Sequence, residues 1–78
     1  QYEEAVNAMR DAYAAMPANM RVLLNLAYVI ITYIQKNGPT PELIQEARSS
    51  LLAANELSPG ELRFIRLMAS LNELSASA

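Results

Sequence analysis

The chain has 78 residues, a formal net charge of -2, and neither Cys nor His. This length predicts one small domain, and the charge does not favour binding to nucleic acid. The missing residue types exclude a disulfide, a thiolate nucleophile and the commonest metal ligand and acid–base group. We therefore expect a protein without catalytic activity and without a cofactor.

The composition is typical of helices. Hydrophobic residues make up 53% of the chain and aromatic residues only 6%, so the apolar surface consists mainly of Ala, Leu, Met, Ile and Val. Pro and Gly divide the sequence into four segments, and none of them shows the alternation of a strand. We expect an all-α fold of about four helices, at 1–16, 20–36, 41–57 and 59–74, with a tail at 75–78.

The first predicted helix ends before Pro17. It carries Ala5, Met9, Ala12 and Met16 at steps of three and four, which places them on one helical face. Gln1 lies inside this predicted helix, and no initiator Met or signal-peptide pattern precedes it. We expect the chain to be a piece of a longer protein.

The second predicted helix is apolar on nearly every side from Val22 to Ile34. A membrane-spanning helix needs about 20 mostly apolar residues, and this run is shorter and contains Asn25 and Thr32. Membrane insertion is therefore not expected. An apolar helix in a protein of this kind is instead expected to be covered by helices on both sides.

Capping residues mark the ends of the second helix. Asn19 is a good N-cap, and Asn37-Gly38-Pro39 is expected to end the helix because Gly readily adopts the left-handed conformation and Pro cannot extend it. Both signals lie close to the limits set by the apolar pattern.

Similar signals mark the third and fourth helices. Thr40 is expected to cap the third helix, with Pro41 at its first position. Ser58-Pro59-Gly60-Glu61 has the sequence of a capping box, in which Ser58 is the N-cap and a Glu follows three residues later. This pattern predicts that the fourth helix begins at about residue 59.

The sequence contains an internal repeat with a spacing of 42 residues. At this shift Pro17 falls on Pro59 and Leu23 on Ile65, and the order small, large, small, proline, large, large, small is preserved. The other matched pairs are Glu4 with Glu46, Ala5 with Ala47, Met9 with Leu51, Ala12 with Ala54, Arg21 with Arg63, Leu26 with Met68 and Ala27 with Ala69.

These residues resemble the tetratricopeptide (TPR) repeat, which has the same order of small, large and proline positions. The matching stretches are Ala5-Met9-Ala12-Pro17 with Leu23-Leu26-Ala27, and Ala47-Leu51-Ala54-Pro59 with Ile65-Met68-Ala69. The standard repeat is about 34 residues long, so we interpret residues 33–41 as an extended hairpin tip. The resemblance implies antiparallel helical hairpins stacked as a short TPR-like α-solenoid, with residues 1–78 as a single module.

A polar face of the second helix is the candidate binding surface. Arg21, Asn25 and Tyr28 are spaced by four and three residues, which places them on one side of the helix. In the proteins that this chain resembles, that face lines a concave groove that binds extended peptides. The resemblance adds three residues of the fourth helix to this surface, namely Arg63, Arg66 and Ser70.

The arginines of this surface indicate a partner that carries carboxylates, such as an acidic peptide. Leu67 stands where a basic residue is expected in the family's carboxylate clamp, so capture of a chaperone C-terminus does not follow from the resemblance. The alternative interpretation is that these arginines are ordinary solvated side chains.

The resulting functional prediction is a non-catalytic scaffold for protein–protein interaction. The module would present its groove to a partner peptide or helix, within a larger, soluble, cytoplasmic protein of a bacterial regulatory or assembly type. The alternative is a homo-oligomerisation or intramolecular packing module attached to another domain, such as a signalling or catalytic one. This module would use an apolar face of the first helix, and a homodimer could form through that face. The face consists of Tyr2, Met9, Tyr13 and Met16.

Overall fold

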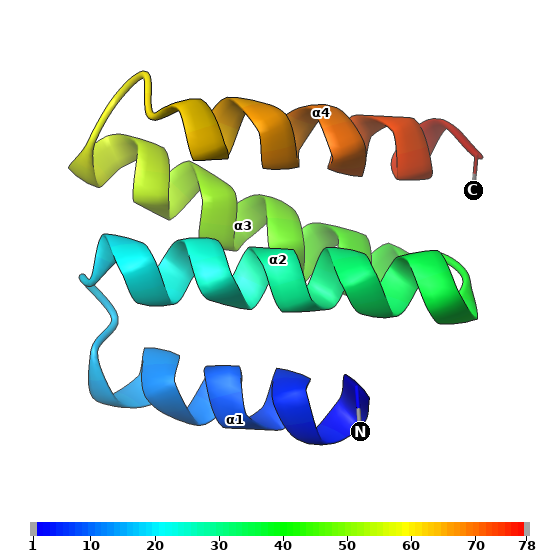
Figure 1. Cartoon of the computed structure of the whole chain (residues 1–78), viewed down its shortest axis with the longest axis horizontal. Helices are drawn as coiled ribbons and strands as arrows, with labels where there is room; N and C mark the ends of the chain where they lie inside the picture. Colours follow the sequence, from blue (N-terminus) through cyan, green and yellow to red (C-terminus); the bar gives the residue numbers. More distant parts are fainter. Residues whose placement is uncertain (1, 78) are drawn as a thin grey trace.

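The computed structural model describes residues 2–77, with the side chains of 3–76, and this range consists of four helices joined by short loops (Figure 1). The helices are α1 (Tyr2–Ala15), α2 (Met20–Asn37), α3 (Pro41–Leu57) and α4 (Leu62–Ser77). The all-α prediction is confirmed for the described residues. Gln1 and Ala78, predicted in the first helix and the tail, lie outside them, as does the side chain of Tyr2.

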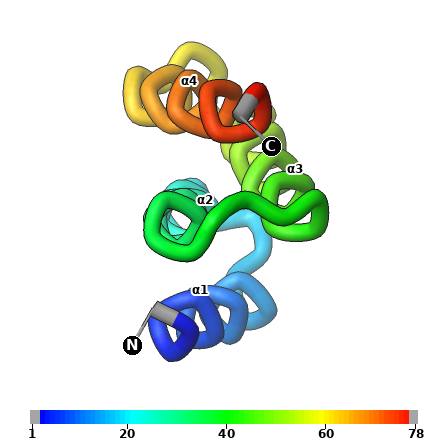
Figure 2. The backbone as a smooth tube through the Cα atoms, turned by 90° about the vertical axis from the view of Figure 1, so that its right-hand side faces the viewer, coloured from blue at the N-terminus to red at the C-terminus, as the bar shows by residue number. Residues whose placement is uncertain are grey.

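Consecutive helices run antiparallel, and α2 lies in the middle of the molecule (Figure 1). Helix α2 packs against α1, α3 and α4, and α3 also packs against α4. Viewed along the helices, α4 lies above α2, α1 lies below it, and α3 lies beside both α2 and α4 (Figure 2). The central helix therefore has neighbours on three sides.

The apolar sequence of α2 follows from this position. Eight of its residues are buried, and Leu23, Ala27 and Ile30 have no exposed surface. The buried residues of α2 are Val22, Leu23, Leu24, Leu26, Ala27, Ile30, Ile31 and Ile34. Within residues 2–77 no helix is long and apolar enough to cross a membrane, in agreement with the prediction from sequence.

Helices α2 and α3 approach each other closely at small residues. The Ser50 hydroxyl is buried and donates a hydrogen bond of 2.6 Å to the carbonyl oxygen of Leu23. A side chain as short as Ser reaches a neighbouring backbone only where the two helices are nearly in contact. Ala27 and Ala47 have no exposed surface and permit this approach, because larger side chains would separate the helix axes.

Two of the predicted N-caps are confirmed. The Asn19 side chain accepts a hydrogen bond of 3.1 Å from the Val22 amide. The Thr40 hydroxyl accepts one of 3.3 Å from the Leu43 amide, with Pro41 in the first turn of α3. Both caps satisfy an amide that has no partner within its helix.

Replacing Asn19 by Ala is expected to lower the free energy of unfolding by about 1 kcal/mol, because the Val22 amide loses its acceptor. Urea denaturation followed by far-UV circular dichroism measures this change. Asn19→Ser is the matched control and should retain most of the stability, since Ser is an equally good N-cap. Equal losses in the two variants would contradict a capping role.

The end of α2 differs in detail from the prediction. Gly38 has a positive φ of 92°, as expected, but its ψ of 151° lies outside the left-handed helical region. Its amide donates a hydrogen bond of 2.7 Å to the carbonyl of Ile34. Gly tolerates this extended backbone with positive φ, which side chains with a Cβ atom rarely adopt.

The predicted capping box at Ser58 is wrong. Ser58 closes α3, since its amide donates to the Ala54 carbonyl at 3.0 Å. Gly60, with a φ of 81°, then turns the chain out of the helical conformation. Helix α4 begins at Leu62 rather than at about 59, and the Ile65 amide donates to the Glu61 carbonyl at 3.1 Å.

The predicted tail at 75–78 is also wrong over residues 75–77, which continue α4 to Ser77. Ala is the strongest helix former and Ser is tolerated in helices, so the small residues of this stretch do not end the helix. Leu74 and Ser75 are half-buried, which shows that the last turns of α4 still touch the rest of the molecule.

Candidate functional site

The predicted polar face of α2 is accessible. Arg21 is exposed, Tyr28 is 53% exposed and Asn25 is half-buried between them. Their spacing of four and three residues places them along one side of the helix. This side is the part of α2 that its three neighbouring helices cover least, since most of its other residues are buried.

Helix α4 meets this face through a hydrogen bond. The Arg63 guanidinium donates from Nη2 to Oδ1 of Asn25 at 2.7 Å. The bond is short because the donor carries a charge. It joins residues that are 38 positions apart in the sequence and links the α2 and α4 halves of the predicted surface.

The remaining predicted residues lie around this pair. Arg66 and Ser70 follow Arg63 at steps of three and four, on the same side of α4, with Arg66 exposed and Ser70 half-buried. Among the side chains described, no hydrogen bond joins Arg21, Tyr28, Arg66 or Ser70 to the Arg63–Asn25 pair. The structure therefore brings one pair of the predicted residues into direct contact.

The charges of the molecule are separated between two pairs of helices. Helices α2 and α4 carry four basic residues and one acidic residue, a net charge of +3. Helices α1 and α3 carry six acidic and two basic residues, a net charge of -4. Glu61, in the loop before α4, is the remaining charge and brings the total to -2, which hides this separation. We refer to the exposed Arg21, Arg63 and Arg66 of α2 and α4 as the basic patch.

The basic patch has hydrogen-bond donors in excess. Each guanidinium has five N–H groups, and the hydrogen bond from Arg63 to Asn25 uses only one of its terminal nitrogens. The Asn25 oxygen accepts from Arg63, so its amide nitrogen is the part of the side chain left to donate to another molecule. Such a surface suits carboxylate groups, which only accept hydrogen bonds.

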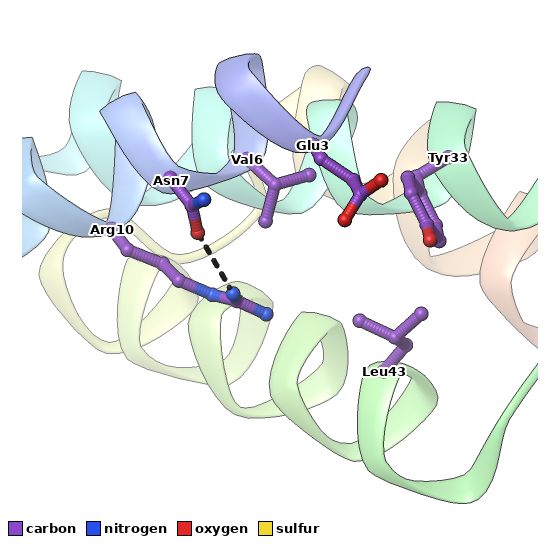
Figure 3. A pocket seen from close by; sticks show the side chains of 6 residues that line it. All are labelled: Glu3, Val6, Asn7, Arg10, Tyr33 and Leu43. Carbon is purple, nitrogen blue, oxygen red and sulfur yellow. Dashed lines mark hydrogen bonds between the residues drawn. The ribbon is translucent and has the colours of Figure 1, made fainter. Parts of the chain in front are cut away.

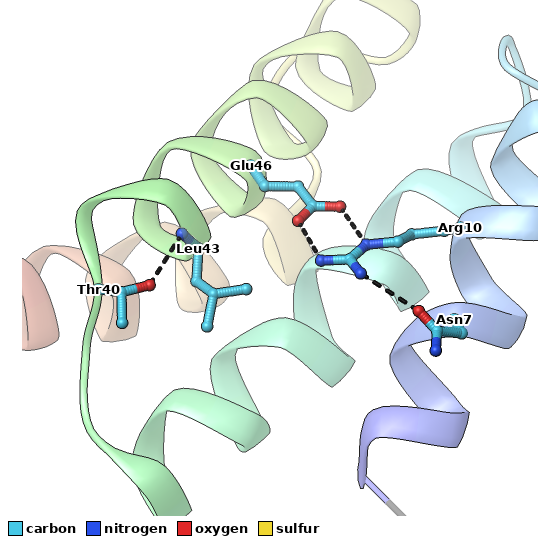
Figure 4. A network of polar contacts seen from close by, with 5 residues as sticks. All are labelled: Asn7, Arg10, Thr40, Leu43 and Glu46. Carbon is cyan, nitrogen blue, oxygen red and sulfur yellow. Dashed lines mark hydrogen bonds and ion pairs between the residues drawn. The ribbon is translucent and has the colours of Figure 1, made fainter.

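A second polar cluster joins α1 to α3 (Figure 4). Arg10 forms a bidentate ion pair with Glu46, with Nε and Nη2 at 2.8 and 2.7 Å from the two carboxylate oxygens. Its Nη1 donates to Oδ1 of Asn7 at 3.2 Å. The hydrogen bond to the Glu46 carboxylate raises the pKa of Arg10 above its ordinary value. Sequence reasoning missed this ion pair, since the two residues are 36 positions apart.

Small cavities lie beside this ion pair. One of about 120 Å³ is lined by Glu3, Val6, Asn7, Arg10, Tyr33 and Leu43, which come from α1, α2 and α3 (Figure 3). Another of about 300 Å³ is lined by Tyr13, Leu26, Glu46, Ser49 and Ser50. Within the described residues, no group of three or more Asp, Glu, His or Cys side chains is placed to hold a metal ion.

The predicted apolar face of α1 is only partly exposed. Tyr13 and Met16 are 41% and 48% exposed. Met9, which was expected to share this face, is half-buried and packs against the core, while the side chain of Tyr2 lies outside the described residues.

No family model, curated protein or solved structure matches the chain.

Proposed function

We propose that the chain is a non-catalytic, TPR-like helical module that binds an extended, acidic peptide along the exposed surface of α2 and α4. The observation that carries this proposal is the separation of charge, with +3 on α2 and α4 and -4 on α1 and α3. An acidic peptide would be attracted to one side of the molecule and repelled by the other.

The arrangement of the helices supports a TPR-like module. The 42-residue repeat relates α1 to α3 and α2 to α4. Helices α2 and α4 pack against each other, as the first helices of successive hairpins do in a stacked array. The lengths of α2 and α3, at 18 and 17 residues, account for a spacing greater than the usual 34 or so.

The contacts of the surface support recognition of carboxylates. Asn25 and Arg63 hold each other in place before any ligand binds, so less side-chain entropy is lost on binding. Arg21 and Arg66 extend the basic patch along α2 and α4. The exposed ring of Tyr28 offers an apolar contact to a neighbouring side chain of the peptide.

Binding to a fluorescent peptide of alternating Glu and Ser tests the proposal, with a Lys–Ser peptide as the comparison. We expect the Glu–Ser peptide to bind and the Lys–Ser peptide not to bind, with an affinity that falls as salt is added. The double variant Arg21→Glu/Arg63→Glu is expected to lose about tenfold or more in affinity for the Glu–Ser peptide, since two attractive charges become repulsive. Fluorescence anisotropy measures each dissociation constant.

Arg48→Glu is the matched control because it makes the same type of charge reversal on α3, where Arg48 contacts Asn72 of α4. Melting curves establish that each variant remains folded. The control should bind the Glu–Ser peptide with an affinity within about twofold of the wild type. Equal affinity of the wild type and the double variant would overturn the proposed binding surface.

A further inference from the structure

Helix α4 has an apolar strip that no other part of the described chain covers. Leu62 and Ile65 are 56% and 52% exposed, and Ala69 and Ala76 are exposed as well. Leu62, Ile65 and Ala69 recur at steps of three and four and form one strip over the first two turns of α4, whereas the exposed side chains of Asn72 and Glu73 separate this strip from Ala76. The strip lies beside the basic patch, since Arg66 follows Leu62 by four residues and lies about 40° from it around the helix, and Arg63 lies further round.

The matching residues of α2 show which helix covers such a strip elsewhere in the molecule. Ile65 and Ala69 match Leu23 and Ala27 of α2, and both of those residues have no exposed surface. The closest neighbour of α2 at this place is α3, since Ser50 donates a hydrogen bond to the Leu23 carbonyl. The first two turns of α4 therefore present the type of surface with which α2 receives α3, whereas Ile30 and Ile31 of α2 are matched by Asn72 and Glu73 on α4.

Helix α1 presents the other half of the same interface. Under the 42-residue shift, Ala5, Ala8 and Ala12 match residues of α3 that are buried, namely Ala47, Ser50 and Ala54. On α1 these positions are less covered, since Ala8 is exposed and Ala5 and Ala12 are half-buried. Each molecule thus has an α3-like surface on α1 and, over its first two turns, an α2-like surface on α4, and these two helices do not pack against each other.

We propose that the chain associates head to tail, with α4 of one copy receiving α1 of the next in the way that α2 receives α3. The hydrogen bond from Ser50 to Leu23 fixes the expected register, because it places Ile65 of one copy opposite Ala8 of the other. The small side chains of Ala69 and Ala5 permit a close approach of the two helices, as those of Ala27 and Ala47 do within one copy.

The charges of the helices favour this pairing over others. Helix α4 has a net charge of +1 and α1 of -2, just as α2 and α3 have net charges of +2 and -2. A symmetric dimer through two copies of α1 would instead bring two helices of like charge together. The head-to-tail arrangement also continues the existing stack, because α1 packs on α2 as α3 packs on α4.

An interface of this kind uses two different surfaces, so each dimer still has one free surface of each type. Larger assemblies therefore form as the protein concentration rises. Sedimentation velocity of the 78-residue chain, from low micromolar to near-millimolar concentration, should show species larger than dimers. Ile65→Arg blocks the α4 surface and Ala8→Arg blocks the α1 surface, so each variant alone should remain monomeric. Leu52→Arg is the matched control, since Leu52 is 49% exposed on α3 and belongs to neither surface.

Mixing the two blocked variants tests the pairing itself. The Ile65→Arg protein retains a working α1 surface and the Ala8→Arg protein a working α4 surface, so an equimolar mixture should form one-to-one heterodimers and nothing larger. Circular dichroism verifies that both variants are folded, and Ala69→Glu serves as a second α4 variant. A wild type that stays monomeric throughout, a mixture that stays monomeric, or association that only Ala8→Arg abolishes would each overturn the proposal.

Discussion

Replacing Leu23 by Ala is expected to lower the free energy of unfolding by about 2–5 kcal/mol. Leu23 has no exposed surface and belongs to the core cluster formed by all four helices, so its removal leaves a cavity that the neighbouring side chains fill only in part. A domain of this length has a total stability of roughly 4–12 kcal/mol. Urea denaturation of Leu23→Ala should therefore show a large fall in the urea concentration at the unfolding midpoint.

Ile65→Ala is the matched control for this substitution. Ile65 occupies the same position in the repeat, but it is 52% exposed. Its truncation is expected to change the free energy of unfolding by about 1 kcal/mol or less, because little buried surface is lost. The measurement is made at the lowest usable concentration, where the chain is monomeric. Equal losses at the two positions would contradict the difference in burial.

Replacing Ala27 by Leu is expected to lower the free energy of unfolding by about 1–3 kcal/mol, because the added atoms do not fit between α2 and α3. Ala27 has no exposed surface, and the hydrogen bond of Ser50 to the Leu23 carbonyl shows how close the two helices are. Thermal and urea denaturation of Ala27→Leu measure the loss.

Ala69→Leu provides the comparison at the matched, exposed position of α4. We expect it to remain within about 0.5 kcal/mol of the wild type in the monomer, since Leu at an exposed helical position meets no close neighbour. A larger loss of unfolding free energy in Ala69→Leu than in Ala27→Leu would show that α4, and not α2, is the closely packed helix of the repeat.

Much of the fold follows from local sequence signals. The apolar run of α2 predicted a helix covered on both sides, and the structure places α1 and α3 against it together with α4. The caps at Asn19 and Thr40 act within three residues of the amides that they satisfy. Such signals are readable because the interacting groups are neighbours in the chain.

The boundary between α3 and α4 shows where local reasoning fails. Ser58 and Glu61 have the spacing of a capping box, but two features of the structure compete with it. Ser58 closes α3, and Asn55 accepts a hydrogen bond of 3.3 Å from the Gly60 amide. The conformation of Gly60 separates the two helices, so the start of α4 moves to Leu62.

The candidate surface could be predicted only in part. Helical spacing placed Arg21, Asn25 and Tyr28 on one face, whereas the contact between Asn25 and Arg63 depends on how α4 packs against α2. The repeat matches Arg63 to Arg21 and gives no indication of this contact. The charge separation was accessible from the sequence once the helices were assigned, because each helix of the α2 and α4 set is basic and each of the other set is acidic.

The repeat is covered in the middle of the molecule and open on α4, and the rate of thiol labelling measures this difference in burial. The chain has no Cys, so Leu23→Cys and Ile65→Cys each introduce a single reporter. At low concentration we expect the Ile65→Cys variant to react nearly as fast as an unfolded peptide and the Leu23→Cys variant to react only through unfolding. Similar labelling rates in both variants under native conditions would contradict a buried Leu23 and an exposed Ile65.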